Sequence, residues 1–388
     1  MKKLIVMAAA LVLLGTLTVI FTGCSLGVKT VVEEKSYDIT DSFDKIEVNA
    51  DVADVEVLPA VDGGCRVDVC GNRKVSYSAA VSDGVLIITE RDDRAWYQKI
   101  IPGFGESRIT VYLPNLEYSS FAVDAATSDV DIKGSFNFGI FDLAVSTGDI
   151  EIEGITADAV SIKVSTGDVE LENVICSGEI KHKCSTGKLE ARDITAGSVS
   201  TVGSSGDVEM ERLTVSGEVA VERDTGELEI YGAIMGGIVT KTSTGCVVME
   251  RVSAAGDIVL ESSTGDITLT EIKCSSFSQS SSTGDLRISN AECETFNSSA
   301  SSSKLCMTSL IVSGTLTAER DSGDVTLDGC DANEIFITTD TGDVRGTLLT
   351  DKVFITRTDT GEIDVPETIT GGKCKITTDT GDIKIEYK

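Results

Sequence analysis

Val145-Ser146-Thr147-Gly148-Asp149-Ile150-Glu151-Ile152 is the stretch that decides the fold of this chain, because close copies of it recur as far as the C-terminus. The position held by Gly148 returns every 19 or 20 residues, in fourteen copies of which twelve have glycine. These positions are Ser128, Gly148, Gly167, Gly187, Gly206, Gly226, Gly245, Gly265, Gly284, Ser303, Gly323, Gly342, Gly361 and Gly381. A fixed period of this length is typical of solenoids.

Aliphatic side chains alternate with polar ones around each glycine position. Every copy is aliphatic two residues after it, as in Ile150, Val169 and Leu189, and large apolar residues such as Phe141 and Val160 lie seven residues before it. A period of two indicates strands. We therefore predict an all-β fold, a parallel β-helix or β-solenoid with 19–20-residue coils stacked about 4.8 Å apart. Ile150, Val169 and Leu189 should then touch along one dry seam.

Glycine before the acidic residue predicts a tight turn. Such a turn needs a residue at positive φ, which glycine adopts without strain. The neighbouring Ser, Thr and Asp side chains can hydrogen-bond the backbone of the turn.

Four segments follow from the pattern. Residues 1–23 are predicted as a lipoprotein signal peptide, 24–39 as a tether, 40–120 as an N-terminal β-rich cap, and 121–388 as a solenoid of about 14 coils. Within the cap we expect a degenerate coil at residues 45–57, a hairpin turning at Asp83-Gly84, and a strand at residues 108–113. The last coil should end the stack, with Glu386 and Lys388 protecting its edge by charge.

The N-terminus has the pattern of an export signal. Lys2 and Lys3 precede an apolar run from residue 4 to residue 21, followed by Thr22-Gly23-Cys24. Cys24 would be lipidated and become the mature N-terminus. The alternative is an uncleaved membrane anchor, since 18 residues is about the minimum that spans a bilayer. Both interpretations place the body outside the cytoplasmic membrane.

The charge balance excludes one class of partner. With 33 Lys+Arg against 63 Asp+Glu the formal net charge is −30, which repels nucleic acid phosphates and anionic headgroups. We predict no nucleic acid partner and no cofactor.

The export signal, the sequence Tyr112-Leu113-Pro114 and the serial Ser-Thr-Gly-Asp coils together resemble the DUF4097 family of adhesin-like bacterial surface lipoproteins. The likeness covers about residues 40–388. It implies a β-helical fold and a place at the cell envelope, where some relatives accompany envelope-stress signalling systems. The family supplies no catalytic residues.

An acidic residue follows the glycine position in eleven of the fourteen copies, and Lys188, Cys246 and Lys304 interrupt the row. The acidic members are Asp129, Asp149, Asp168, Asp207, Glu227, Asp266, Asp285, Asp324, Asp343, Glu362 and Asp382. One interpretation is a row of solvated acids that cap the turns. The other is a site for a basic partner or for weak divalent cation binding, although calcium takes six to eight oxygens.

Trp96, Tyr97 and Phe104 form an apolar loop that we predict as a candidate partner site, or alternatively as a cover for the core of the cap. His182 is the only histidine. We interpret it as structural, because no Ser/His/Asp or Cys/His pairing can be assembled without it.

Ten cysteines besides Cys24 show no CxxC spacing, which argues against zinc sites. Several occupy core positions of the repeat, where cysteine acts as a small hydrophobe. The alternative is at least one disulfide, with Cys65–Cys70 and Cys274–Cys293 as the best pairs.

We predict a non-enzymatic, extracytoplasmic lipoprotein, held at the membrane by its lipid, that acts as an adhesin-like or scaffold protein for an envelope or extracellular partner. The alternative is an accessory or sensory component of a cell-envelope stress system. A glycan-active enzyme is the third hypothesis, because polysaccharide lyases also use β-helices. Their longer and more irregular coils differ from the uniform ones here.

Overall fold

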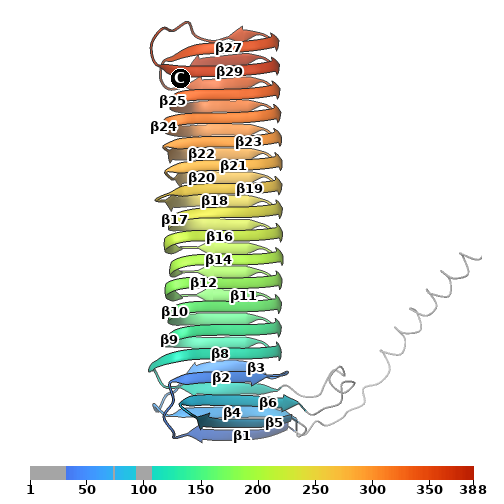
Figure 1. Ribbon diagram of the computed structural model, residues 1–388, viewed down its shortest axis with the longest axis vertical. Coiled ribbons are helices and arrows are strands. Elements are labelled where there is room, and N and C mark those ends of the chain that lie inside the picture. The colour runs from blue at the N-terminus through green and yellow to red at the C-terminus, as the bar shows by residue number, and fades with distance from the viewer. Residues whose placement is uncertain (1–31, 73–74, 93–106) are drawn as a thin grey trace, which may run out of the picture.

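The computed structural model describes residues 32–72, 75–92 and 107–388, whose regular elements are all β-strands. These strands stack along one long axis into an elongated solenoid (Figure 1). The predicted all-β solenoid with coils of 19–20 residues is confirmed.

Seven strands form the N-terminal base: β1 (Val32–Ile39), β2 (Lys45–Ala50), β3 (Asp54–Pro59), β4 (Cys65–Asn72), β5 (Val75–Ser82), β6 (Val85–Asp92) and β7 (Arg108–Leu113). The body contains β8 (Glu117–Thr127), β9 (Val130–Thr147), β10 (Ile150–Thr166), β11 (Val169–Glu172), β12 (Ile175–Thr186), β13 (Leu189–Arg192), β14 (Thr195–Ser205), β15 (Val208–Glu211), β16 (Thr214–Thr225), β17 (Leu228–Thr244), β18 (Val247–Ala254), β19 (Asp257–Thr264), β20 (Ile267–Lys273), β21 (Ser276–Thr283), β22 (Leu286–Cys293), β23 (Thr295–Ser302), β24 (Leu305–Ser322), β25 (Val325–Thr341) and β26 (Val344–Leu348). The top contains β27 (Lys352–Thr360), β28 (Ile363–Asp364), β29 (Gly372–Thr380) and β30 (Ile383–Tyr387).

Each coil of the body bends at three corners, which divide it into three β segments. In one coil, β15 is the first segment, and β16 carries the other two with a shift of register between Val215 and Glu218. Each segment pairs in parallel with the same segment of the next coil, as Ile150 does with Val169 and Val169 with Leu189. All three of these side chains are at most 2% exposed. The dry seam that the sequence predicts is therefore confirmed.

The first corner, which we call the Asp corner, contains the glycine position and the residue after it. Most of its glycines have φ between 114° and 159°, where other residues are strained. Crowding between coils adds a second constraint. A Cβ on Gly206 would lie only 2.0 Å from the carbonyl oxygen of Gly187 in the preceding coil. Glycine is needed here for backbone conformation and for close stacking.

The second corner, which we call the left-handed corner, follows the first segment and is not evident from the sequence. Its residue has φ near +55° even where it is not glycine, as at Asn173, Asp193, Arg212 and Arg251. Asn and Asp tolerate this conformation, whereas Arg rarely adopts it. Because Arg occupies two of these positions, no repeated turn residue marks this corner in the sequence.

The third corner, which we call the groove corner, is made of small residues. A Cβ on Gly197 would approach the carbonyl oxygen of Gly178 to 2.7 Å, and one on Gly217 would approach that of Gly197 equally closely. The backbones of successive coils therefore come close together at this corner.

The base is built around the coil of β2 and β3. The coil of β6 and β7 lies beneath it, although it comes later in the chain, because β6 pairs with β2 and β7 with β3. β4 and then β1 extend the β7 side in antiparallel fashion, and β5 pairs with β6. The expected hairpin at Asp83-Gly84 and the strand at residues 108–113 are thus confirmed. Residues 32–39, predicted as the end of a tether, instead form β1, because β4 offers them a free edge.

The last two coils are interleaved at the top of the stack. β29 lies between β25 and β27, and β30 lies between β26 and β28 (Figure 1). The final coil is therefore inside the stack, and the expectation that Glu386 and Lys388 protect the terminal edge is wrong. Pro366 lies in the return loop between β28 and β29. The inserted coil has partners on both sides, which stabilises it more than a place at the end would.

Candidate functional site

The acidic row at the Asp corner forms a ladder of hydrogen bonds between coils. The Oδ1 atom of Asp149 accepts a bond from the backbone N–H of Asp168 at 2.8 Å, and that of Asp168 accepts one from the N–H of Lys188 at 2.7 Å. Ten such bonds, of 2.7 to 3.1 Å, join successive Asp corners. Each carboxylate therefore caps an amide of the next coil, which gives the row a structural role.

Only aspartate accepts this bond among the described residues of the row. Every Asp bonds the amide of the next coil, whereas Glu227, Cys246, Lys188 and Lys304 do not. The glutamate side chain is one methylene longer, so its carboxylate extends beyond the backbone N–H of the next coil and does not accept its hydrogen bond. The ladder begins one coil earlier than the sequence pattern suggests, at Asp54, whose Oδ1 accepts from the N–H of Asp129 at 3.1 Å. The signal for Asp54 was the sequence Ala53-Asp54-Val55, a copy without the glycine.

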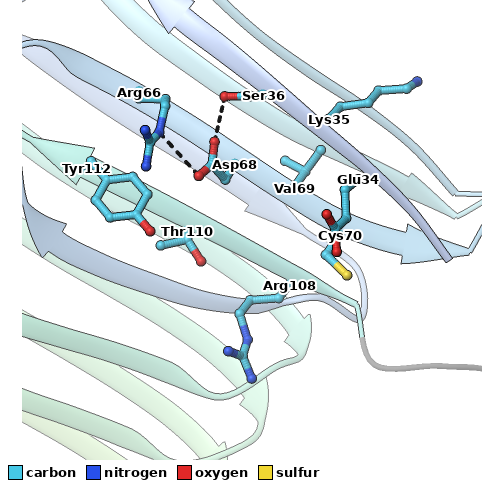
Figure 2. A pocket seen from close by; sticks show the side chains of 10 residues that line it. All are labelled: Glu34, Lys35, Ser36, Arg66, Asp68, Val69, Cys70, Arg108, Thr110 and Tyr112. Carbon is cyan, nitrogen blue, oxygen red and sulfur yellow. Dashed lines mark hydrogen bonds and ion pairs between the residues drawn. The ribbon is translucent and has the colours of Figure 1, made fainter.

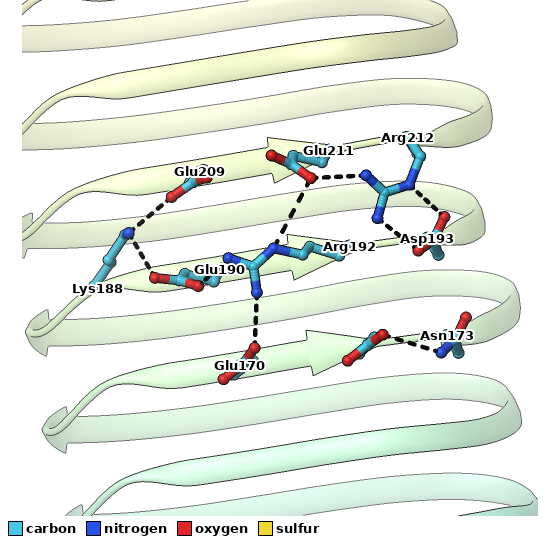
Figure 3. A network of polar contacts seen from close by, with 10 residues as sticks. Glu170, Asn173, Lys188, Glu190, Arg192, Asp193, Glu209, Glu211 and Arg212 are labelled. Carbon is cyan, nitrogen blue, oxygen red and sulfur yellow. Dashed lines mark hydrogen bonds and ion pairs between the residues drawn. The ribbon is translucent and has the colours of Figure 1, made fainter.

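Lys188, which interrupts the acidic row, pairs with glutamates on the face of the solenoid that the first segments of the coils form (Figure 3). Its Nζ lies 2.6 Å from Glu190 and 2.8 Å from Glu209 in the next coil. Arg192 lies beside it and reaches Glu170 at 2.8 Å and Glu190 at 2.5 Å. Hydrogen bonding from Lys188 holds the pKa of Glu190 below its ordinary value. These ion pairs stabilise the stacking of consecutive coils.

A polar pocket of about 490 Å³ lies on the outer face of the base, across β1, β4 and β7 (Figure 2). The guanidinium of Arg66 stacks over the ring of Tyr112, 4.4 Å from its centroid, and Nε lies 3.2 Å from a carboxylate oxygen of Asp68. Asp68 also accepts a 2.6 Å hydrogen bond from the Ser36 hydroxyl. Arg66 and Tyr112 therefore form a fixed platform.

Arg108 lines the same pocket from the start of β7. It is exposed, and in the described part of the chain its guanidinium has no hydrogen-bond or ion-pair partner. Arg108 is four residues before Tyr112 on β7 and opposite Cys70, so it lies at the other end of the pocket from the Arg66–Tyr112 pair (Figure 2). A guanidinium group can bind a carboxylate or phosphate group through two parallel hydrogen bonds. No sequence motif marks this pocket, because its residues come from three strands far apart in the chain.

A longitudinal groove follows the groove corner. Its most apolar part, about 450 Å³, has Cys176, Ala196 and Val215 in its floor and Ile175 and Ile234 in its wall. The two isoleucines are 51% and 65% exposed. Equivalent parts of the groove lie near the base and near the top. The groove is thus apolar in the middle of the rod, whereas charged and polar side chains line it near the base and near the top.

His182 lies in the interior at 1% exposure, and its Nδ1 is 2.9 Å from the hydroxyl of Thr201. Burial lowers its pKa to about 3, with a further contribution from the nearby charge of Arg223. Arg223 donates to the same Thr201 hydroxyl at 3.2 Å. A neutral histidine enclosed in this way is placed for packing rather than for chemistry on a solvent-borne substrate.

Several predicted sites lie outside the described residues. They are Cys24, the lipidation site, and the loop residues Trp96, Tyr97 and Phe104. Within the described ranges, no three His, Cys, Asp or Glu side chains gather closely enough to hold a metal ion. The same ranges contain no helix long and apolar enough to span a membrane.

The structure separates one of the two predicted cysteine pairs. Cys65 and Cys70 lie five residues apart on the single strand β4, so their side chains point to opposite faces and are too distant for a disulfide. Cys65 faces the interior, and burial raises its pKa to about 12. All ten described cysteines are unpaired thiols.

Comparison with solved structures finds several β proteins of low sequence identity. A "putative cell adhesion protein" from Clostridium sporogenes is 9% identical, covers 56% of this chain and 99% of its own, and has a TM-score of 0.28. A "putative adhesin" from Bacteroides fragilis is 14% identical, covers 92% and 97%, and has a TM-score of 0.22. A "putative lipid binding protein" from Parabacteroides distasonis is 14% identical, covers 81% and 96%, and has a TM-score of 0.21.

A search of the curated proteins finds no match to this sequence. The family model described as Toastrack DUF4097 matches residues 43–233 and 289–388, which is about three quarters of the chain. The match includes the base, most of the coils and the interleaved top, in agreement with the resemblance seen in the repeat. The chain belongs to the Toastrack DUF4097 family.

Proposed function

We propose that this chain is a non-enzymatic, extracytoplasmic lipoprotein whose solenoid binds an envelope or extracellular partner through the polar pocket of its base. The observation that carries the proposal is the Arg108 guanidinium, which has no partner among the described residues and lines the same pocket as the Arg66–Tyr112 platform. Its setting favours a partner with a carboxylate or phosphate group. The chain as a whole has a formal net charge of −30 and would repel such a group elsewhere.

The solenoid supports a binding role because it presents the pocket on a rigid frame. The outward residues of the pocket alternate with inward residues such as Val67, Val69 and Ile109, all at most 3% exposed. The platform is therefore fixed by the packed core beneath it, and little entropy is lost when a ligand is bound.

The pocket would lie close to the membrane. Seven residues lie between Cys24 and Val32, the first residue of β1, so a lipid on Cys24 would be at most about 29 Å from the base. A partner would then be an envelope component near the membrane surface, with the rest of the rod extending away from it.

Lipidation and binding are tested separately. Labelled palmitate should be incorporated into the wild-type chain and not into Cys24→Ala, and continued labelling of the variant would contradict lipidation at Cys24. For binding, a photo-crosslinking residue at position 36, in the pocket, should capture a partner on intact cells.

The Arg108→Ala variant should reduce that crosslink at least tenfold. Arg357→Ala is the matched control, because Arg357 is an exposed arginine on β27 at the other end of the rod, paired with Asp359 at 3.0 Å. Equal crosslinking in Arg108→Ala and in the control would contradict the pocket as the binding site.

A further inference from the structure

Cys274 and Cys293 are stacked directly on one another in the groove corner. β20 and β22 pair in register up to Lys273 and Glu292, the residues that precede the two cysteines. The backbone N–H of Cys274 also bonds the carbonyl oxygen of Glu292 at 3.1 Å. Residues opposed in this way on parallel strands have Cα atoms about 4.8 Å apart, which lies within the 4.4–6.8 Å range of disulfides.

No other described cysteine has a cysteine above or below it. Cys176 occupies the same row of the groove floor, but its neighbours there are Ala157 and Ala196. Cys330 stacks between Leu310 and Leu348, and Cys374 pairs with Ile335 and Phe354. Among the described residues, the stacking of the coils therefore brings two cysteines within the Cα separation of a disulfide at this place only.

We propose that Cys274 and Cys293 are a thiol pair that a small-molecule disulfide converts into a cystine bridge between consecutive coils. The thiolate of Cys274 attacks one sulfur of the donor disulfide, which forms a mixed disulfide and releases the first donor thiol. The sulfur of Cys293 then attacks Cys274, and the second donor thiol leaves. Two protein thiols are oxidised and one donor disulfide is reduced to two thiols, so atoms and electrons balance.

The environment of the pair assigns the order of these two steps. The Cys293 thiol donates a hydrogen bond to the sulfur of Cys274, which lowers the pKa of Cys274 and raises that of Cys293. Cys274 is thus the first nucleophile and Cys293 the resolving thiol. Both are 8% exposed, more than Cys176 in the same row at 1%, so a small donor reaches them more readily than it reaches Cys176.

The bridge is tested on the full chain with oxidised glutathione as the donor. Purified protein is incubated with the donor, the remaining thiols are alkylated under denaturing conditions, and the peptides are mapped by mass spectrometry. We expect two fewer alkylated thiols than in the untreated protein, and a peptide pair joined through Cys274 and Cys293. The Cys293→Ser variant should stop at a glutathione adduct on Cys274, because the resolving thiol is absent.

Cys176→Ser is the matched control, because Cys176 shares the groove floor and lacks a stacked partner. It should lose the same two thiols as the wild type on oxidation. The proposal is overturned if native protein keeps all its thiols at donor concentrations that oxidise exposed dithiols. It is equally overturned if the joined peptides contain other cysteines, or if Cys274→Ser forms the adduct on Cys293 at the wild-type rate.

Discussion

The carboxylate of Asp343 accepts a hydrogen bond from the backbone N–H of Asp382, 39 residues further along the chain, at 2.8 Å. Asp382 in turn accepts a bond from the N–H of Glu362 at 3.0 Å. Between Asp129 and Asp343 the bonds of the Asp ladder join residues 19 or 20 apart. The doubled interval shows that the ladder follows the order of coils in space rather than their order in the chain.

Aspartate and glutamate should differ at the Asp corner. Glu227→Asp should create the missing bond to the N–H of Cys246 and slow hydrogen exchange of that amide severalfold. Removing an existing bond with Asp168→Ala should destabilise the chain by about 1 kcal/mol, since the net contribution of such a bond is of that size. Glu218→Asp, on an exposed strand position, is the control. An unchanged exchange rate at Cys246 in Glu227→Asp would contradict the ladder rule.

Alanine at two glycines with positive φ should separate crowding from backbone strain. At Gly232 a Cβ meets nothing within 4 Å, so Gly232→Ala should cost only the strain of its φ of 65°, about 1 kcal/mol. At Gly206 the same Cβ would overlap the Gly187 carbonyl oxygen. Gly206→Ala should cost more than about 3 kcal/mol or prevent folding. Equal melting temperatures for the two variants would refute the crowding argument.

His182 should make the protein sensitive to mild acid. Its folded pKa of about 3 lies below the ordinary 6.5, so between these values the unfolded chain binds a proton that the folded chain does not. Stability is present above pH 6.5 and falls as the pH falls, by up to about 1.4 kcal/mol per pH unit. His182→Leu should flatten urea midpoints between pH 6.5 and 4, because Leu143 and Ile162 occupy the same interior column. Parallel pH profiles for both proteins would contradict this assignment.

The ion pairs around Arg192 should respond to salt. Arg192→Gln leaves Glu170 and Glu190 without their shared cation and should destabilise the chain by about 1 kcal/mol at low ionic strength. The difference should shrink in about 1 M salt, where charges are screened within about 3 Å. Arg357→Ala, which breaks a single exposed pair, should change stability by less than about 0.5 kcal/mol. A loss of stability in Arg192→Gln that is independent of salt would indicate lost packing instead.

The body of the fold was predictable because one physical rule repeats in it. The glycine period and the alternation around Ile150, Val169 and Leu189 predict coil length, strand type and buried face without further information. The left-handed corner was hidden, because backbone conformation at Arg212 and Arg251 is imposed by the stack rather than by the residue. The order of coils at both ends was hidden as well, because a coil with the repeat pattern fits equally well above or below its neighbour.

The candidate site was less accessible to sequence reasoning. The acidic row was visible in the sequence. Its role depends on how far each carboxylate lies from the backbone N–H of the next coil, which distinguishes Asp from Glu227 and is known only from the structure. The pocket with Arg66, Arg108 and Tyr112 is assembled from strands of different coils, so no local motif marks it. Of the cysteine pairs, spacing alone did not separate Cys65–Cys70 from Cys274–Cys293, whereas the stacking register does.

The interleaved ends have a consequence for how the rod is made. Coils in the middle can be added one after another as the chain folds. The top cannot close in this way, because β27 and β28 reach their final position only when residues 372–387 have slipped in below them. In a chain that ends before residue 372, β27 and β28 lack the strands β29 and β30 with which they pair. Placement of residues 372–387 therefore completes the top of the rod.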